Sequence, residues 1–236
     1  MHRLRGRDSA ATPATRRRLP LCGMRRLLPT CATANTPKGA RMMAINYEQL
    51  RAAVRNQGHR FFETGDYNLN LVGVRAQDRH ADTFNDLLCV AFQIQGQTHC
   101  FSFPATTDPG VYWREHLANP AGAAIVKPGQ YPSVWALGKH QGKYEALVQR
   151  APITVYRDAN RDAYLQTGDK VETGLFGINC HRATDAGQSL RVDRWSAGCQ
   201  VIADSADFDV LMALCRKAAG LYGNRFTYTL LDEGDL

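Results

Sequence analysis

A histidine and a cysteine in the stretch from His181 to Cys199 give the sequence its clearest candidate for chemistry. A cysteine attacks a carbonyl carbon as the thiolate, so it needs a base to remove its proton and N–H donors to hold the oxyanion that the attack creates. His181 is the candidate base. The main-chain N–H groups of Gly198 and Cys199 are the candidate oxyanion donors, because small residues here let the main chain approach a substrate carbonyl.

The chain order of the pair narrows the class of enzyme. All seven histidines lie at or before position 181, so a histidine that pairs with Cys199 must precede it, whereas papain-like enzymes have the opposite order. A caspase-like nucleophile has the right order but lies in a Gln-Ala-Cys-x-Gly motif, and the residues around Cys199 differ from it. The remaining alternative is a cysteine that is merely small and buried, which is the commonest fate of a free cysteine.

The pair resembles the catalytic motif of the L,D-transpeptidase (YkuD-type) family. That motif is a histidine, a spacer, and then Ser/Thr-His-Gly-Cys. Fourteen residues separate His181 from Ser196, which suits the family spacing, and Ser196, Gly198 and Cys199 match the motif. Ala197 takes the place of the second histidine.

Other parts of the chain carry the resemblance less strongly. The segment from Lys127 to Tyr131 is similar to the family's Thr-Pro-x-Gly-x-Phe segment, so that the similarity covers about residues 87–203. Arg182 stands where a small residue is usual, and Val201 stands where a polar or basic residue is common. The resemblance therefore predicts the family's chemistry but not its usual contacts with substrate.

The resemblance implies a role for each site residue. Cys199 would be the nucleophile and His181 the general base and then acid. A backbone carbonyl just after the catalytic histidine orients the ring in this family, which implies that role for the main chain of Arg182. Asp185 or Asp193 is a side-chain alternative.

The residues next to the nucleophile are expected to shape the turn and the cleft. We expect Ser196 to fix the turn by hydrogen bonding. The substrate-binding candidates are Trp195, Ala197 and Tyr131.

The substrate implied by the resemblance is the stem peptide of bacterial peptidoglycan. Attack at an L,D-linked amide would give a thioester acyl-enzyme, and the acceptor would be an amine, which gives a cross-link, or water, which gives hydrolysis. The motif departures at Ala197 and Val201 favour a hydrolytic, phage-lysin-like use as the alternative. A non-catalytic wall-binding or structural module with the same fold is the alternative from another class.

The thiol chemistry leads to two further expectations. An imidazolium beside Cys199 would lower the pKa of the thiol below its ordinary value of about 8.5. Zinc is a second possibility, because His181, Cys199 and one of His99 or Cys100 could converge on a metal. The chain has no CxxC or HxxxH spacing, so we expect no metal and no cofactor.

The charge of +7 is concentrated at one end of the chain. Residues 1–41 hold ten Lys and Arg and one Asp, so the rest of the chain is nearly neutral. The rest of the chain has no basic-aromatic pattern, which argues against a nucleic-acid partner. No apolar run reaches the length of about eighteen residues that a transmembrane helix needs. Localisation and oligomeric state stay open.

Residues 1–42 are interpreted as a disordered basic tail or a mis-assigned start, and residues 43–236 as one domain. That domain is expected to be mostly β or α+β, an L,D-transpeptidase-like β domain with helices near both ends. Residues 104–150 are expected to form long loops with one helical turn near 112–117, because they contain many Pro and Gly. The expected helices are 46–58 and 204–220, and the expected strands are 69–75, 87–94, 98–103, 153–157, 174–180, 199–202 and 225–230.

Overall fold

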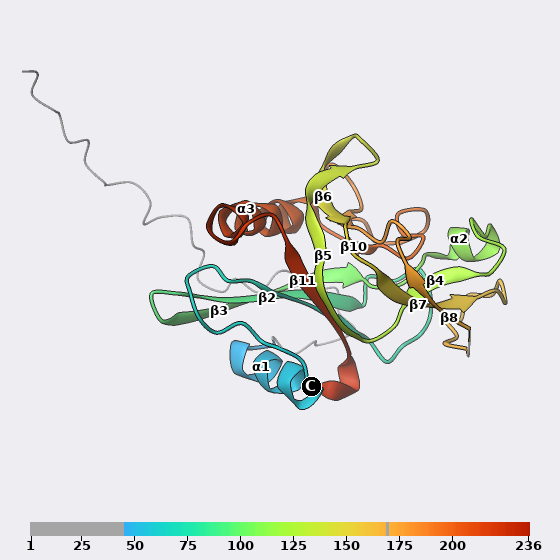
Figure 1. The fold of residues 1–236 in the computed structure, drawn as a ribbon. Helices are drawn as coiled ribbons and strands as arrows, with labels where there is room; N and C mark the ends of the chain where they lie inside the picture. The colour runs from blue at the N-terminus through green and yellow to red at the C-terminus, as the bar shows by residue number, and fades with distance from the viewer. Residues whose placement is uncertain (1–44, 169) are drawn as a thin grey trace, which may run out of the picture. The chain divides into compact units, whose positions relative to one another are not determined.

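The structure is a computed structural model that describes residues 45–168 and 170–236, so the interpretation of residues 1–42 lies outside the described part. Helix α1 (Tyr47–Asn56) begins with the predicted capping box: Asn46 Oδ1 accepts from the Gln49 N–H at 2.9 Å, and the Gln49 side chain accepts from the Asn46 N–H at 3.1 Å. The buried face of α1 packs against one face of the neighbouring strands, as Figure 1 shows.

Eight strands form a closed barrel, in the order β1-β11-β5-β6-β9-β10-β3-β2. Two neighbouring pairs, β1 with β11 and β9 with β10, are parallel, and the other pairs are antiparallel. The barrel strands are β1 (Asn70–Arg75), β2 (Asp86–Ile94), β3 (Gln97–Thr106), β5 (Gly129–His140), β6 (Tyr144–Gln149), β9 (Cys180–Arg182), β10 (Gln200–Ile202) and β11 (Phe226–Asp232). The structure is therefore mostly β, with helices near both ends, as predicted.

A second sheet of three strands has the order β4-β7-β8. Its strands are β4 (Ala123–Val126), β7 (Ile153–Asp158) and β8 (Val171–Gly174). The short helix α2 (Val111–Glu115) lies at the same end of the molecule as this sheet (Figure 1). This helix confirms the predicted helical turn.

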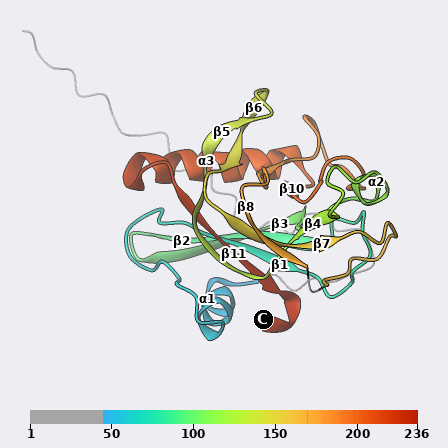
Figure 2. The ribbon, with the colours of Figure 1, turned by 45° about the vertical axis from the view of Figure 1, so that its right-hand side comes forward.

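Helix α3 (Ser205–Tyr222) runs across one side of the barrel (Figure 2). Asp204 caps it by accepting from the Ala206 N–H at 2.7 Å, as predicted. Its buried residues share one hydrophobic cluster with the barrel core; they are Phe208, Leu211, Met212, Cys215 and Ala218. After β11 the chain ends in a short 3-10 helix, η1 (Glu233–Asp235).

The barrel core is centred on large aromatic side chains. The Trp135 and Tyr228 rings are fully buried and stack with centroids 4.4 Å apart. Cys180 and Cys215 are buried in the same cluster, and Cys89 is buried on the side that faces α1. The prediction that Cys89 and Cys215 are core residues is confirmed.

The prediction of long loops over residues 104–150 is wrong, because this segment contains β4, β5 and β6. Strand β5 does not alternate regularly between buried and exposed residues, and its pairing with β11 shifts register between Phe226 and Tyr228. Pro132, Ser133 with a φ of 52°, and Gly138 lie within it. An irregular strand with turn-forming residues has the sequence signature of a loop.

The predicted strand 174–180 is also wrong in extent. Strand β8 ends at Gly174 and β9 begins at Cys180. Between them Gly177 has a φ of 75°, and the Gln149 side chain accepts from the N–H groups of Phe176 at 3.0 Å and Ile178 at 2.9 Å. In this segment the Gln149 side chain therefore makes the hydrogen bonds that a neighbouring strand would make in a sheet.

No helix within residues 45–168 and 170–236 is long and apolar enough to cross a membrane.

Candidate cysteine–histidine active site

The pairing of β9 with β10 places His181 beside the strand that directly follows Cys199. The two strands are parallel, with Val201 opposite His181 and Gln200 opposite Cys180. Side chains two residues apart on a strand point to the same face, so Cys199, which directly precedes β10, would share the face of Val201 and His181 if the strand were extended by one residue. The loop of Cys199 therefore lies next to the strand of His181, although the thiol donates its hydrogen bond to the Gly177 carbonyl and not to the His181 ring.

The opposite face of the same strands anchors them in the barrel. Gln200 accepts from the Tyr228 hydroxyl at 2.6 Å and donates to the Thr107 carbonyl at 3.4 Å. Cys180 is fully buried in the core. The prediction that Cys180 faces away from the site is confirmed, and Gln200 fixes the strand just after the nucleophile.

The His181 ring is held by a main-chain carbonyl. Its Nδ1 lies 2.8 Å from the Arg182 carbonyl oxygen, and the Tyr144 hydroxyl lies 3.3 Å from both atoms. This agrees with the role that the family resemblance implies for the main chain of Arg182; within the described residues, neither Asp185 nor Asp193 bonds the ring. A proton on Nδ1 directed to this carbonyl leaves Nε2 as an acceptor.

A second histidine stacks on the first. The rings of His140 and His181 have centroids 4.1 Å apart, and His140 Nδ1 lies 3.1 Å from the Asn179 side-chain nitrogen. Neither His140 nor Tyr144 was among the predicted site residues, because both lie in the segment predicted as loops. The signal that could have found them is the turn around Gly142, with a φ of 72°, which joins β5 to β6 and aligns His140 with Tyr144.

The pKa values of the pair favour neutral groups at rest. Burial, with a smaller effect of His140, lowers the pKa of His181 to about 4. Burial of the sulfur raises the pKa of Cys199 to about 11, although a hydrogen bond from the Asn179 main chain opposes this, and the thiol donates to the Gly177 carbonyl at 3.4 Å. The expectation of a lowered thiol pKa is therefore wrong for the resting site, because burial of the sulfur outweighs the hydrogen bond from Asn179.

The turn before the nucleophile is fixed by Ser196. Its buried hydroxyl donates to the Cys199 carbonyl at 2.8 Å and accepts from the Gly198 N–H at 3.1 Å, which confirms the predicted role. The Gly198 N–H is therefore occupied, and this corrects its expected role as an oxyanion donor. Within the described residues no hydrogen bond uses the Cys199 N–H, which leaves it for an oxyanion.

Gly198 is required at its position by space and by backbone conformation. Its φ is 122°, and an added Cβ would lie 2.5 Å from the Ala124 carbonyl oxygen. Both features exclude a larger residue without movement of the turn. Gly198 therefore allows the turn before Cys199 to pack closely against β4.

The predicted substrate-binding residues lie in different surroundings. Trp195 is 45% exposed, and Ala197 is exposed beside a small cavity of about 40 Å³ that is also lined by Trp113 and Arg157. Tyr131 directs its hydroxyl to the carbonyls of residues 127 and 154, so it fastens β5 to the small sheet. The structure therefore gives Tyr131 no contact with the pair.

Helix α2 supports the loop that carries the nucleophile. The Gly110 N–H, just before the helix, donates to the Ser196 carbonyl at 2.9 Å, and the Trp113 indole donates to the Arg194 carbonyl at 2.9 Å. A Cβ on Gly110 would collide with the backbone of Asp193. The chain from 193 to 196 is therefore held closely against α2.

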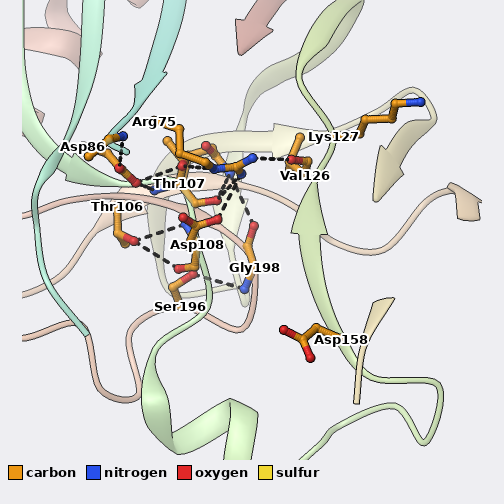
Figure 3. A network of polar contacts seen from close by, with 12 residues as sticks. Arg75, Asp86, Thr106, Thr107, Asp108, Val126, Lys127, Asp158, Ser196 and Gly198 are labelled. Carbon is orange, nitrogen blue, oxygen red and sulfur yellow. Dashed lines mark hydrogen bonds and ion pairs between the residues drawn. The ribbon is translucent and has the colours of Figure 1, made fainter. Parts of the chain in front are cut away.

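A buried network of polar groups lies beneath the same turn. The Arg75 guanidinium is 2% exposed, donates to the Val126 carbonyl at 2.9 Å, and pairs with Asp108 at 3.0 Å. Asp86 accepts from the Thr107 N–H at 2.6 Å. Figure 3 shows Arg75 and Asp108 beside Ser196 and Gly198, which did not follow from the sequence pattern.

The zinc alternative has no support from geometry. His99 stacks on Phe92 at 5.3 Å, and Cys100 packs against the cluster that contains α1. Residues 45–168 and 170–236 contain no group of three or more His, Cys, Asp or Glu arranged to hold a metal ion.

Comparison with known proteins adds no relative: no protein-family model, no curated protein and no solved structure matches this chain. Only the geometry of the site and the motif therefore indicate the function.

Proposed function

We propose that the protein is a cysteine acyltransferase or peptidase of the L,D-transpeptidase type, acting on the stem peptide of bacterial peptidoglycan. The observation that carries the proposal is the register of β9 with β10, in which His181 lies opposite Val201, two residues after Cys199. The hydrogen bond between the His181 ring and the Arg182 carbonyl supports it, because it leaves Nε2 free to accept a proton.

The mechanism begins from a neutral pair. His181 Nε2 takes the thiol proton as the Cys199 sulfur attacks the substrate carbonyl, and the oxyanion faces the Cys199 N–H. The C–N bond then breaks, His181 returns the proton to the leaving amine, and a thioester remains on Cys199. An amine or water attacks the thioester, with His181 again as the base, and the thiol is restored.

We infer that water is the acceptor. Ala197 replaces the histidine of the family motif, and the cavity beside it is only about 40 Å³, so few side-chain groups are available to hold a second peptide. We therefore expect hydrolysed stem peptide to exceed cross-linked product when purified peptidoglycan fragments are supplied with excess acceptor stem. Mass spectrometry of the products decides this point, and abundant cross-linked product would show that the site is a transferase.

The experiment that tests catalysis is detection of the acyl-enzyme. Wild-type protein incubated with stem-peptide fragments should gain the mass of an acyl group on Cys199. Cys199→Ala should lose both the adduct and product formation, and Cys100→Ser, which alters a partly buried thiol outside the pair, should retain both. Binding of fragments by wild type without adduct or product would instead support the non-catalytic alternative.

A further inference from the structure

The loop after β7 has the sequence pattern of a cation-binding loop. Asp158, Asn160 and Asp162 alternate along the chain, and Tyr164 follows two residues later. Calcium loops of the EF-hand type place side-chain oxygens at positions 1, 3 and 5 and a main-chain carbonyl at position 7. The segment from Asp158 to Tyr164 supplies oxygens at the same four positions, but it has Ala163 at position 6, where EF-hand loops have glycine.

A cation from elsewhere in the chain occupies the centre of this loop. It is the guanidinium of Arg114 in α2, whose side chain is 1% exposed. The oxygens around it are Asp158 Oδ2 at 3.0 Å, Asn160 Oδ1 at 3.0 Å, Asp162 Oδ1 at 3.2 Å, the Asp162 carbonyl at 2.6 Å and the Tyr164 carbonyl. Arg114 Nη1 is buried without a hydrogen bond and faces only the Asp158 carboxylate.

The loop holds its own oxygens in place. The Asn160 N–H donates to Asp158 at 3.2 Å, the Gln166 N–H donates to Asp158 at 2.8 Å, and the Tyr164 N–H donates to Asp162 at 2.8 Å. These bonds do not involve Arg114. The arrangement of oxygens should therefore persist when the Arg114 side chain is removed.

Charge and access both suit a divalent ion in place of the guanidinium. Without Arg114 the loop would keep two carboxylates, one of them on the buried Asp158, and an unpaired buried carboxylate is costly. Asn160, Asp162 and Tyr164 are exposed, so an ion can enter from solvent. Oxygen-only ligands of this kind select hard cations such as Ca²⁺.

We propose that the segment from Asp158 to Tyr164 is a calcium-type loop whose cation is the Arg114 guanidinium, and that Ca²⁺ occupies the loop when this side chain is removed. The guanidinium anchors α2 to the small sheet. Since the neighbouring Trp113 holds the Arg194 carbonyl, Arg114 is a positioning residue for the loop that carries Cys199. This proposal does not depend on the proposed activity.

The test compares Arg114→Ala with wild type in a chelator and in Ca²⁺ at roughly millimolar concentration, the affinity of the weaker calcium modules. Arg114→Ala should have a lower Tm in chelator, gain several degrees in Ca²⁺, and bind one equivalent of Ca²⁺ by calorimetry. Wild type should show neither effect. The rate of Cys199 alkylation should fall in Arg114→Ala and recover with Ca²⁺, a response that a merely structural role would not give.

Matched variants assign the effect to this loop. Arg114→Lys keeps a cation in the loop and should gain no Tm from Ca²⁺, and Arg114→Ala combined with Asn160→Ala and Asp162→Ala should lose the gain. Equal Ca²⁺ responses in wild type and Arg114→Ala, or no response in a folded Arg114→Ala, would overturn the proposal. If Arg114→Ala is insoluble, the variant should become soluble when it is refolded in Ca²⁺. Failure of this refolding would also overturn the proposal.

Discussion

His181 and Cys199 are both neutral at rest, and in this they differ from a preformed thiolate–imidazolium pair. Burial disfavours the charged form of each group, so it lowers the pKa of His181 to about 4 and raises the pKa of Cys199 to about 11. At neutral pH the proton is on sulfur and the ring is free to accept it. Proton transfer then accompanies attack on the substrate instead of preceding it.

This state of the pair predicts the pH dependence of reactivity. His181 is a base only above its folded pKa, so the alkylation rate of Cys199 should rise through about pH 4, stay nearly level to neutral pH, and rise again as the thiol ionises. Alkylation by iodoacetamide followed by mass spectrometry from pH 3.5 to 9 measures the profile. A midpoint near the ordinary histidine pKa of about 6.5 would contradict the neutral pair.

His181 also links pH to stability. Its pKa is lower in the folded than in the unfolded state, so the unfolded state binds more protons between about pH 4 and about pH 6.5. The stability that depends on neutral His181 is present above the unfolded pKa and is lost as pH falls through the folded one. Acid lowers the unfolding free energy of the wild type, and His181→Gln should remove part of this loss. The part that is removed should lie between about pH 4 and about pH 6.5.

Gly198 and Gly187 offer a matched test of the turn before the nucleophile. Both have positive φ, 122° and 70°, but an added Cβ at Gly198 would meet the Ala124 carbonyl, whereas nothing lies within 4 Å of one at Gly187. Gly198→Ala should lower Tm by several degrees and slow Cys199 alkylation about tenfold or more, because the turn must move. Gly187→Ala should cost only about 1 kcal/mol and leave alkylation unchanged. Similar effects of the two variants would show that steric contact with β4 does not seat the loop.

At the scale of elements, the sequence predicts structure best where one local signal is sufficient. The capping box at Asn46, the cap at Asp204 and the apolar face of α3 predicted both long helices. Strand β5 was missed because its long-range pairing with β11 overrides a local sequence that contains Pro132 and Gly138, and its hairpin partner β6 was missed with it. The loss of β5 and β6 also concealed His140 and Tyr144, which the β5–β6 turn brings to His181.

Gln149 tests how a single side chain holds the segment between β8 and β9. It bonds the main chain of Phe176 and Ile178 and donates to the Gly174 carbonyl at 2.9 Å. Gln149→Met should orphan these groups and lower the unfolding free energy by about 1–3 kcal/mol, as measured by urea denaturation. Gln97→Met, at an exposed position on β3, is the control and should change stability by less than about 0.5 kcal/mol. Equal losses in the two variants would show that the Gln149 bonds contribute no net stability.

At the scale of the whole molecule, the Arg75 network connects parts that are far apart in the sequence. Arg75 ends β1, Asp86 begins β2, Asp108 follows β3 and Val126 ends β4. No periodic pattern in the sequence marks charged residues that only the closed barrel brings together, so this part of the site could not be predicted. The same closure places the network beside the Ser196–Gly198 turn (Figure 3).

Replacing Arg75 by Met should destabilise the barrel in a pH-dependent way. Burial, and then Asp108, raise the pKa of Asp86 above its ordinary value, and Arg75 opposes this. Without Arg75 the folded state would hold protons more tightly than the unfolded one, so its stability should fall as pH rises above about 4. The Tm difference between wild type and Arg75→Met should therefore be larger at pH 8 than at pH 5. Adding Asp108→Asn should restore part of the stability that is lost at pH 8, since it removes one of two like charges. If Arg75→Met loses the same stability at pH 5 and pH 8, the carboxylates do not need the guanidinium.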